Sequence, residues 1–165
     1  MERRPKRKPT RLPKFDYSSP GVYFLTLCTK ERQCILGRVL DRPTEADLPV
    51  LRLSPLGQLV SRQIQAMNDL YESVSVDHFV VMPNHVHLLL VVLNEEKASS
   101  AANATVPRFI STLKRFSNQQ AGMDLWQRSY HDHVVRSERD YLRIWQYIDS
   151  NTEKWKTDCF YQADF

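Results

Sequence analysis

The feature that most constrains this sequence is a pair of apolar segments separated by only two residues. Residues 74–82 (VSVDHFVVM) and 85–93 (HVHLLLVVL) flank Pro83-Asn84. Two such segments with a tight connection predict an antiparallel β-hairpin. The second segment is apolar on both faces beyond its histidines. We therefore expect a central strand that is covered on both sides, or covered on one side and packed in an interface on the other.

The N-terminal half predicts one further strand and one helix. Residues 22–29 combine β-branched and aromatic residues and follow the turn-forming residues Ser19-Pro20-Gly21, which is typical of a strand. Residues 37–54 contain two prolines, and we expect them to be irregular. Ser54 can cap a helix that begins at Pro55, because apolar residues then recur at helical spacing.

The C-terminal half predicts a helix over residues 106–120, a short strand within residues 125–135, and a last helix from Glu138 to about Asn151. Ser137 is the expected cap of that last helix. The resulting order is β–α–β–β–α–β–α. It predicts the α+β class, with an antiparallel sheet of four to five strands and helices packed against it.

The positive charge of the chain is concentrated at its N-terminus. The formal net charge is +4, and residues 1–14 alone hold seven Lys or Arg and one Glu. A basic, proline-rich segment without periodicity is expected to be flexible. It is either a solubilising tail or an arm that binds nucleic-acid phosphates, and composition does not decide between them. We expect residues 15–165 to form a single domain.

Membrane insertion and secretion are not expected. The longest apolar run, residues 88–93, is far too short to span a bilayer, and no apolar stretch follows the N-terminal charges as in a secretory signal. The three cysteines form no C-x-x-C pair, which argues against a zinc site or a disulfide framework. These features predict a cytoplasmic protein.

His85 and His87 are the first candidates for a functional site. Side chains two apart on a strand point to the same face, so both imidazoles can reach one ion. Neutral imidazole is a common ligand of divalent metals. The alternative is a surface pair or a satisfied core pair. Burial of two unpaired imidazoles in so apolar a strand would be costly, which favours the metal interpretation.

Tyr147 and Asn151 are the second pair of candidates. They are four residues apart in the predicted last helix and hence on one of its faces. A tyrosine can be a covalent nucleophile when a nearby group or a metal stabilises its phenolate. Asn151 offers a neutral oxygen ligand that suits magnesium or manganese. A packed tyrosine is the alternative, and composition makes Tyr130 and Tyr141 equal candidates for the nucleophile.

The third set of candidates is basic and is interspersed with aromatic residues. Such mixtures bind phosphates and stacked bases, although each residue alone also suits a solvated helix face. The predicted DNA-binding residues are Lys114, Arg115, Arg128, Arg136, Lys154 and Lys156.

Four stretches, in this order, carry a resemblance to a known family: GVYFLTLCT, VVMPNHVHLLL, LWQRSYHDHVVRSERDY and YIDSNTEKW. They resemble the single-tyrosine HUH transposases, which mobilise small bacterial insertion sequences as single strands. The similarity is greatest to the branch called REP-associated tyrosine transposases. It extends over residues 15–156 and implies a ferredoxin-like HUH endonuclease fold.

The resemblance also implies roles for individual residues. His85 and His87 would be the metal-binding pair, Asn151 the third ligand and Tyr147 the nucleophile, with Lys154 near the phosphate. One magnesium or manganese ion would polarise the scissile phosphate, and attack by Tyr147 would form a 5′-phosphotyrosine and release a 3′-hydroxyl. The reverse step would rejoin strands, so no nucleotide cofactor is needed.

The implied partner is single-stranded or hairpin DNA in a bacterial cytoplasm, with association to the nucleoid during action. Relatives include homodimers that exchange the tyrosine helix and also monomers, so both states stay open. Thr152 stands where the family has a proline, which lets the last helix run further.

Two other functions stay open: a hairpin-DNA-binding regulator that does not cleave, and a metal-dependent phosphohydrolase that uses water. The presence of both histidines and Tyr147 weighs against the regulator. The lack of Asp or Glu beside the histidines in the sequence weighs against the hydrolase.

Overall fold

The computed structural model of the chain describes residues 15–40, 48–93 and 104–162, so the basic arm predicted at 1–14 lies outside the described residues. Its strands are β1 (Gly21–Cys28), β2 (Gly37–Leu40), β3 (Val50–Leu53), β4 (Val74–Val81), β5 (His85–Val92) and β6 (His131–Val135). Its helices are α1 (Pro55–Leu70), α2 (Thr105–Ala121) and α3 (Glu138–Asp149), with short 3-10 turns η1 (Lys30–Arg32) and η2 (Trp155–Thr157). None of the helices in this described part has the length and apolarity that a bilayer crossing demands.

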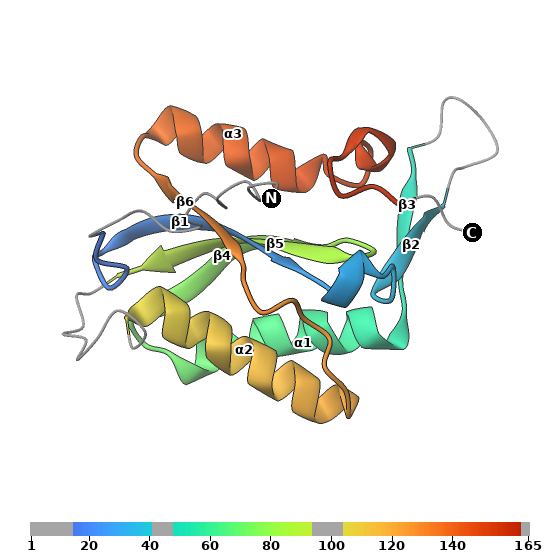
Figure 1. The fold of residues 1–165 in the computed structure, drawn as a ribbon. Coiled ribbons are helices and arrows are strands. Elements are labelled where there is room, and N and C mark those ends of the chain that lie inside the picture. Colours follow the sequence, from blue (N-terminus) through green and yellow to red (C-terminus); the bar gives the residue numbers. More distant parts are fainter. Residues whose placement is uncertain (1–14, 41–47, 94–103, 163–165) are drawn as a thin grey trace, which may run out of the picture.

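Four strands form one antiparallel sheet in the order β4-β5-β1-β6. The predicted hairpin is confirmed as β4–β5, and β5 pairs with β1 from Gly21 opposite Val92 to Cys28 opposite His85. β5 is therefore a central strand. Figure 1 shows that helices cover both faces of the sheet, α1 and α2 on one side and α3 on the other. The α+β class and the central, doubly covered second strand are confirmed.

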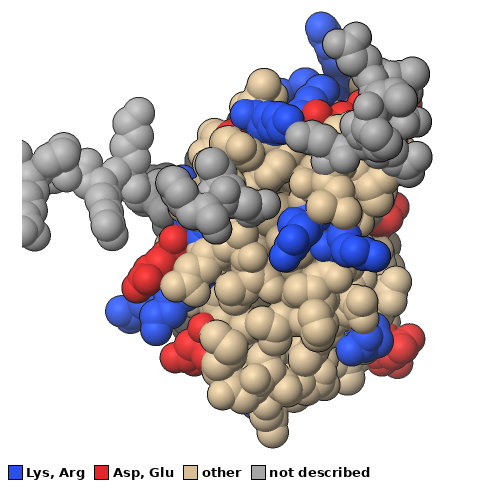
Figure 2. Space-filling view, turned by 90° about the vertical axis from the view of Figure 1, so that its right-hand side faces the viewer, with Lys and Arg blue, Asp and Glu red and all other residues tan. Residues whose placement is uncertain are grey.

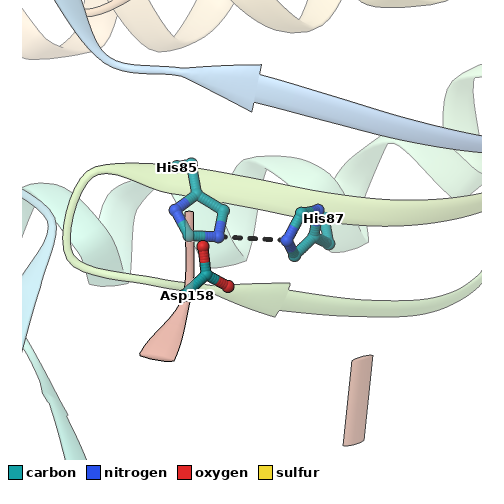
Figure 3. A group of neighbouring side chains, drawn as sticks. All are labelled: His85, His87 and Asp158. Atoms are coloured by element: carbon teal, nitrogen blue, oxygen red, sulfur yellow. Dashed lines mark hydrogen bonds between the residues drawn. The ribbon is translucent and has the colours of Figure 1, made fainter. Parts of the chain in front are cut away.

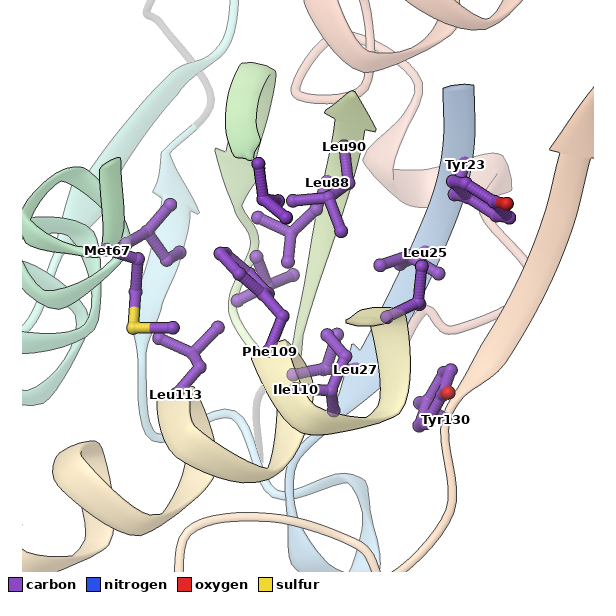
Figure 4. Close-up of a cluster of buried hydrophobic side chains, with 14 of the residues drawn as sticks. Tyr23, Leu25, Leu27, Met67, Leu88, Leu90, Phe109, Ile110, Leu113 and Tyr130 are labelled. Atoms are coloured by element: carbon purple, nitrogen blue, oxygen red, sulfur yellow. The ribbon is translucent and has the colours of Figure 1, made fainter. Parts of the chain in front are cut away.

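The larger core lies between the sheet and the layer of α1 and α2 (Figure 4). Alternate residues of β1 and β5 point to this side, because side chains alternate along a strand. The fully buried side chains here include Leu25, Leu27, Leu88, Leu90, Met67, Phe109 and Leu113. A smaller cluster of Leu89 with Ile144 and Ile148 joins α3 to the opposite face. The intervening positions of β5, which include His85 and His87, therefore face α3.

Contacts with β4 hold α3 above the sheet. The ring of Trp145 stacks on His78 with centroids 4.3 Å apart, and the Tyr141 hydroxyl donates to the Asp77 carboxylate. Stacking and charge-assisted hydrogen bonding both restrict how α3 can rotate about its axis. The face of α3 that carries Tyr147 is thereby directed toward the histidines of β5.

The expectation that residues 37–54 are irregular is wrong for residues 37–40 and 50–53, which form two strands. β2 and β3 pair with each other in a separate two-stranded ribbon. Pro49 immediately precedes β3, where a missing N–H costs no ladder hydrogen bond, and Pro43 lies outside the described residues. Each strand is only four residues long, so alternation over so short a run gives little signal.

The last helix is shorter than predicted. α3 ends at Asp149, with Ser150 as its C-terminal cap, and turns follow. The predicted end at about Asn151 lies two residues beyond the observed end, and the expectation that the helix continues past Thr152 is wrong. The backbone N–H of Asn151 still bonds the carbonyl of Ile148 at 3.3 Å. Asn151 therefore lies just beyond the helix, at the start of a segment that turns back through η2.

Gly57 in α1 packs directly against the backbone of Leu36. A Cβ there would lie 1.9 Å from the carbonyl oxygen of Leu36. That carbonyl accepts a 2.9 Å hydrogen bond from the N–H of Ser54, the cap of α1. The contact fixes the helix against the segment that leads into β2.

We expect Gly57→Ala to destabilise the fold. In an exposed helix the change stabilises by roughly 1 kcal/mol. Here the clash with backbone forces a displacement, whose cost is about 1–3 kcal/mol. Urea unfolding should show a lower midpoint than the parent, while Gln58→Ala at an exposed neighbouring position should stay close to it. A Gly57→Ala protein as stable as the parent would contradict this packing.

Candidate metal centre

His85 and His87 lie at the start of β5 and are buried, with exposed fractions of 0% and 1%. Their Nε2 atoms are 3.1 Å apart. Figure 3 shows the two imidazoles side by side on one strand, with Asp158 reaching them from a separate segment. The structure thus places both rings on one face of β5, as the alternation of side chains requires.

Asn84 fixes the protonation of His85. Its Nδ2 donates to the backbone carbonyls of Arg32 (3.2 Å) and Phe160 (2.8 Å), so its Oδ1 faces Nδ1 of His85 at 2.9 Å. An amide oxygen can only accept, so Nδ1 of His85 carries the proton. Nε2 of His85 is then a bare lone pair directed at the neighbouring imidazole.

Thr26 holds His87 from the adjacent strand. The two residues are opposite each other in the β1–β5 register, and Oγ1 of Thr26 is 2.8 Å from Nδ1 of His87. When that Nδ1 also carries its proton, two Nε2 lone pairs face each other, and a shared cation would stabilise them. Adjacent ligands at about 2.1 Å from an octahedral ion are about 3 Å apart. The observed separation of 3.1 Å fits this arrangement.

Burial keeps both histidines in the neutral, ligating form. Burial lowers the pKa of His85 to about 4, against an opposing effect of the Asp158 carboxylate. Burial and the neighbouring His85 hold the pKa of His87 well below its ordinary value. Protons therefore compete little with a metal at neutral pH.

Two oxygen donors reach the histidines from the segment after α3. Ligand atoms of His85, His87 and Asp158 all lie within 4.8 Å of one another. Asn151 is fully buried and its Nδ2 donates to Oδ2 of Asp158 at 3.3 Å. Its Oδ1 has no hydrogen-bond partner in the described part of the chain. A buried acceptor left unsatisfied is costly, so this atom is a further candidate ligand.

The hydroxyl of Tyr147 lies at the edge of this group. It is 3.3 Å from Nε2 of His87 and donates to Oδ2 of Asp158 at 3.2 Å. Burial, reinforced by the charge of Asp158, raises the pKa of Tyr147 to about 12. The phenol is therefore protonated at neutral pH and already has a proton acceptor beside it.

The two other tyrosines that composition left open lie elsewhere. Tyr141 donates to Asp77 on β4, and Tyr130 is buried in the large core on the opposite side of the sheet.

A cavity of about 550 Å³ opens beside Tyr147. Two aromatic rings form part of its wall, Phe24 from β1 and Phe160 from the C-terminal segment. The ring of Phe24 lies 5.1 Å from that of His87 and 6.0 Å, edge to face, from that of Tyr147. Flat apolar surfaces of this kind can stack an unpaired base.

Three side chains with basic groups line the same cavity. Arg143, Lys154 and His133 contribute to the wall. The Asp140 carboxylate holds two of these side chains in place. It lies 2.6 Å from the Arg143 guanidinium and 2.7 Å from Nε2 of His133. Hydrogen bonds from Arg143 and His133 lower the pKa of Asp140 to about 2. The cavity therefore offers both positive charge and apolar surface beside the Tyr147 hydroxyl.

The fold separates the six basic residues predicted to bind DNA. Lys154 lines the cavity with Tyr147. The Lys114 ammonium donates to the carbonyls of Gln127 (2.7 Å) and Ser129 (3.1 Å), and burial lowers its pKa to about 8, so it secures the segment before β6. The others do not line the cavity: Arg115, which lies over the ring of Phe116 on the opposite helical layer, and Arg128, Arg136 and Lys156.

Sequence reasoning missed Asp158, Asn84 and Thr26. The argument that no carboxylate accompanies the histidines is wrong, because the chain returns after α3 and brings Asp158 to them. No local residue pattern in the sequence predicts that the chain turns back in this way. Thr26, by contrast, follows from the register of β1 on β5, which places it opposite His87.

Known proteins share this fold. No protein-family model matches the chain. An uncharacterised protein of Haemophilus influenzae is 28% identical over 174 residues, covering 94% of this chain and 93% of that protein. A solved structure of a REP-associated tyrosine transposase bound to a REP hairpin matches with a TM-score of 0.56 and 18% identity. A suggested transposase of Deinococcus radiodurans matches with a TM-score of 0.50 and 21% identity.

The coverage of the two structures differs. Each match covers 80% of this chain, but 66% of the hairpin-bound transposase and 91% of the Deinococcus protein. The chain thus spans just under two thirds of the length of the hairpin-bound relative. The predicted structural similarity to tyrosine transposases is confirmed at the level of the fold.

We expect Thr26→Val to weaken manganese binding. The change keeps the shape of the side chain but removes the hydroxyl that orients His87. Loss of such a partner lowers metal affinity by about 10- to 100-fold. Isothermal titration calorimetry measures the change, and Thr112→Val, which removes a hydroxyl bonded to Tyr71 on the other helical layer, is the matched control. Equal affinities for the two variants would contradict this role.

Acid should destabilise the metal-free protein. The pKa of His85 is about 4 in the folded chain against 6.5 when unperturbed, so between these values the unfolded chain binds more protons. The free energy of unfolding therefore decreases as the pH falls. His85 alone accounts for a decrease on the order of 2 kcal/mol between pH 6.5 and pH 5. His87 acts in the same direction.

Urea unfolding with a chelator at pH 7 and pH 5 measures this dependence. His85→Gln should flatten it, whereas Gln58→Ala, at an exposed position on α1, should leave it unchanged. A parent protein equally stable at both pH values would show that the imidazoles are not held neutral by burial.

Proposed function

We propose that this protein is a metal-dependent single-stranded DNA endonuclease and strand transferase, a transposase-type enzyme with Tyr147 as nucleophile. One observation carries the proposal: the Tyr147 hydroxyl lies within 3.3 Å of both His87 and Asp158, at the wall of an open cavity. The fold shared with a transposase that binds a REP hairpin supports DNA as the substrate.

The proposed metal ligands are His85 and His87, with oxygen donors from Asn151 and Asp158. The unpartnered Oδ1 of Asn151 and the two facing Nε2 atoms support this set. A mixture of imidazole, amide and carboxylate suits magnesium or manganese. When bound, the ion supplies Lewis-acid polarisation of the scissile phosphate.

The chain itself supplies the nucleophile and its proton acceptor. The pKa of Tyr147, about 12, means that the phenol must lose its proton as it attacks. Oδ2 of Asp158 already accepts the hydrogen bond from that hydroxyl, so this carboxylate is positioned to take the proton. The phosphotyrosine conserves the bond energy, and a second 3′-hydroxyl can reverse the step without a nucleotide cofactor.

The cavity beside Tyr147 is the proposed binding place for the nucleotides around the cleaved bond. Phe24 and Phe160 can stack bases, and the cationic groups of Lys154 and Arg143 can bind phosphates. Stacking and charge together position the scissile phosphate in front of the hydroxyl, and such positioning can lower the barrier of a reaction by about 7–11 kcal/mol.

One chain carries the nucleophile, the histidine pair and the oxygen donors together. Tyr147 contacts His87 of its own chain. This arrangement supports a site that is complete within one subunit, so we propose that a monomer suffices for the first cleavage step.

Tyr147→Phe is expected to bind DNA as the parent does but to form no covalent adduct. The test uses a labelled DNA hairpin with a single-stranded extension, manganese and a denaturing gel. The parent should give a protein–DNA band that Tyr147→Phe lacks, and Tyr71→Phe, which removes a hydroxyl bonded to Thr112 on the other helical layer, is the control. An adduct that persists in Tyr147→Phe would move the nucleophile to another tyrosine.

A phosphohydrolase that uses water is the second candidate, because Asp158 supplies the carboxylate that the sequence did not place at the histidines. In that case the parent and Tyr147→Phe would both cleave DNA, and neither would be trapped on it. A regulator without cleavage would instead bind the hairpin and leave it intact in every variant.

A further inference from the structure

Outside the cavity, the ribbon of β2 and β3 carries a pair of positive charges. Arg38 and Arg52 are opposite each other in the antiparallel register, and both are exposed. Side chains directly opposite in such a pair lie on one face of the ribbon, and like charges placed there destabilise it. Neither guanidinium pairs with a carboxylate of a described residue. Within the described part of the chain, the two positive charges are therefore not neutralised and can attract an anion.

The two arginines also line a groove. A cavity of about 660 Å³ lies between the ribbon and the start of α1, with Ser54 and Pro55 on its other side. None of the described residues that line it is acidic. The exposed face of the ribbon adds two aliphatic side chains, Leu40 and Val50, next to the guanidinium groups. A two-stranded ribbon of this kind has the dimensions to enter a groove of duplex DNA.

The ribbon is tied directly to the turn that precedes the histidines. The N–H of Leu36 donates to the carbonyl of Pro83 at 2.9 Å, and Leu36 in turn accepts from Ser54. Arg38 is two residues from Leu36, and His85 is two residues from Pro83. With 3.8 Å between consecutive Cα atoms, the Cα atoms of Arg38 and His85 are at most about 22 Å apart.

That distance is short on the scale of nucleic acid. One strand of a duplex carries a phosphate every 3.4 Å along the axis, so about six nucleotides bridge the gap. Figure 1 places β2 and β3 at the end of the molecule where the β4–β5 turn and the C-terminal segment also lie. Figure 2 views this end and shows Lys and Arg in small groups across it, with acidic side chains mostly toward its margins.

We propose that the Arg38 and Arg52 face of the ribbon binds the phosphate backbone of the DNA flanking the cleavage site. This inference rests on the proposed function, since it takes the substrate to be DNA. The planar guanidinium donates two parallel hydrogen bonds to a phosphate, which suits it to this task better than a point charge. Contacts to phosphate fix position and register rather than sequence, so the ribbon orients the duplex and the cavity receives the strand that is cut.

The test compares Arg38→Gln/Arg52→Gln with Arg62→Gln/Arg108→Gln, which removes equal charge from exposed positions on α1 and α2. Fluorescence anisotropy with a labelled hairpin bearing a single-stranded extension gives Kd at several salt concentrations. Each phosphate contact contributes about 0.9 to the slope of log Kd against log salt, so the ribbon variant should lose about 1.8. The control should keep the parent slope.

Unchanged manganese affinity, with an unfolding midpoint no lower than that of the parent, would show that the ribbon variant is folded. Equal slopes for parent and ribbon variant would overturn the inference, as would a parent that does not bind the hairpin. A parent that binds with the expected slope difference but forms no covalent adduct would contradict the proposed cleavage and leave the ribbon as a DNA-binding surface.

Discussion

The side chain of Asn84 is the interaction on which the site depends. It bonds the carbonyl of Arg32 in η1, the carbonyl of Phe160 in the C-terminal segment, and Nδ1 of His85. Three segments distant in sequence therefore meet at one buried amide. Since all its donors and its acceptor are used inside the protein, replacement by an apolar residue would leave several buried partners unsatisfied. Its orientation also decides which nitrogen of His85 is available to a ligand.

Electrostatics around the histidines follow from their burial. The apolar centre of the sheet disfavours charge, so both imidazoles stay neutral, and the same environment raises the pKa of Tyr147. A cation in this place would reverse the balance, because it favours every lone pair and every anion around it. The buried amide oxygen of Asn151 and the carboxylate of Asp158 fit such a change. The group of His85, His87 and Asp158 could therefore hold a metal ion.

The two faces of the sheet differ in how they are packed. The α1 and α2 side holds the large core and determines stability, while the α3 side holds a small cluster and leaves room for a cavity. β5 serves both, because its alternate residues Leu88 and Leu90 enter the core, and His85 and His87 face the cavity side. The strand can present polar ligands from a rigid position since its other face is fully packed.

The sequence by itself determined the class of the fold, the β4–β5 hairpin, the central place of β5 and the shared face of His85 and His87. These are consequences of periodicity and of a tight turn, which act over a few residues. It did not reveal β2 and β3, whose four-residue alternation is too short to recognise, nor the end of α3 at Asp149.

Only the tertiary structure decided which groups surround the histidines. Asp158 and Asn151 reach them because the chain turns back after α3, and Tyr147 faces them because His78 and Asp77 hold that helix in place. The position of such a segment depends on packing against elements far away in the chain. Local residue patterns do not encode that packing. The site predicted from the sequence therefore lacks the Asp158 carboxylate.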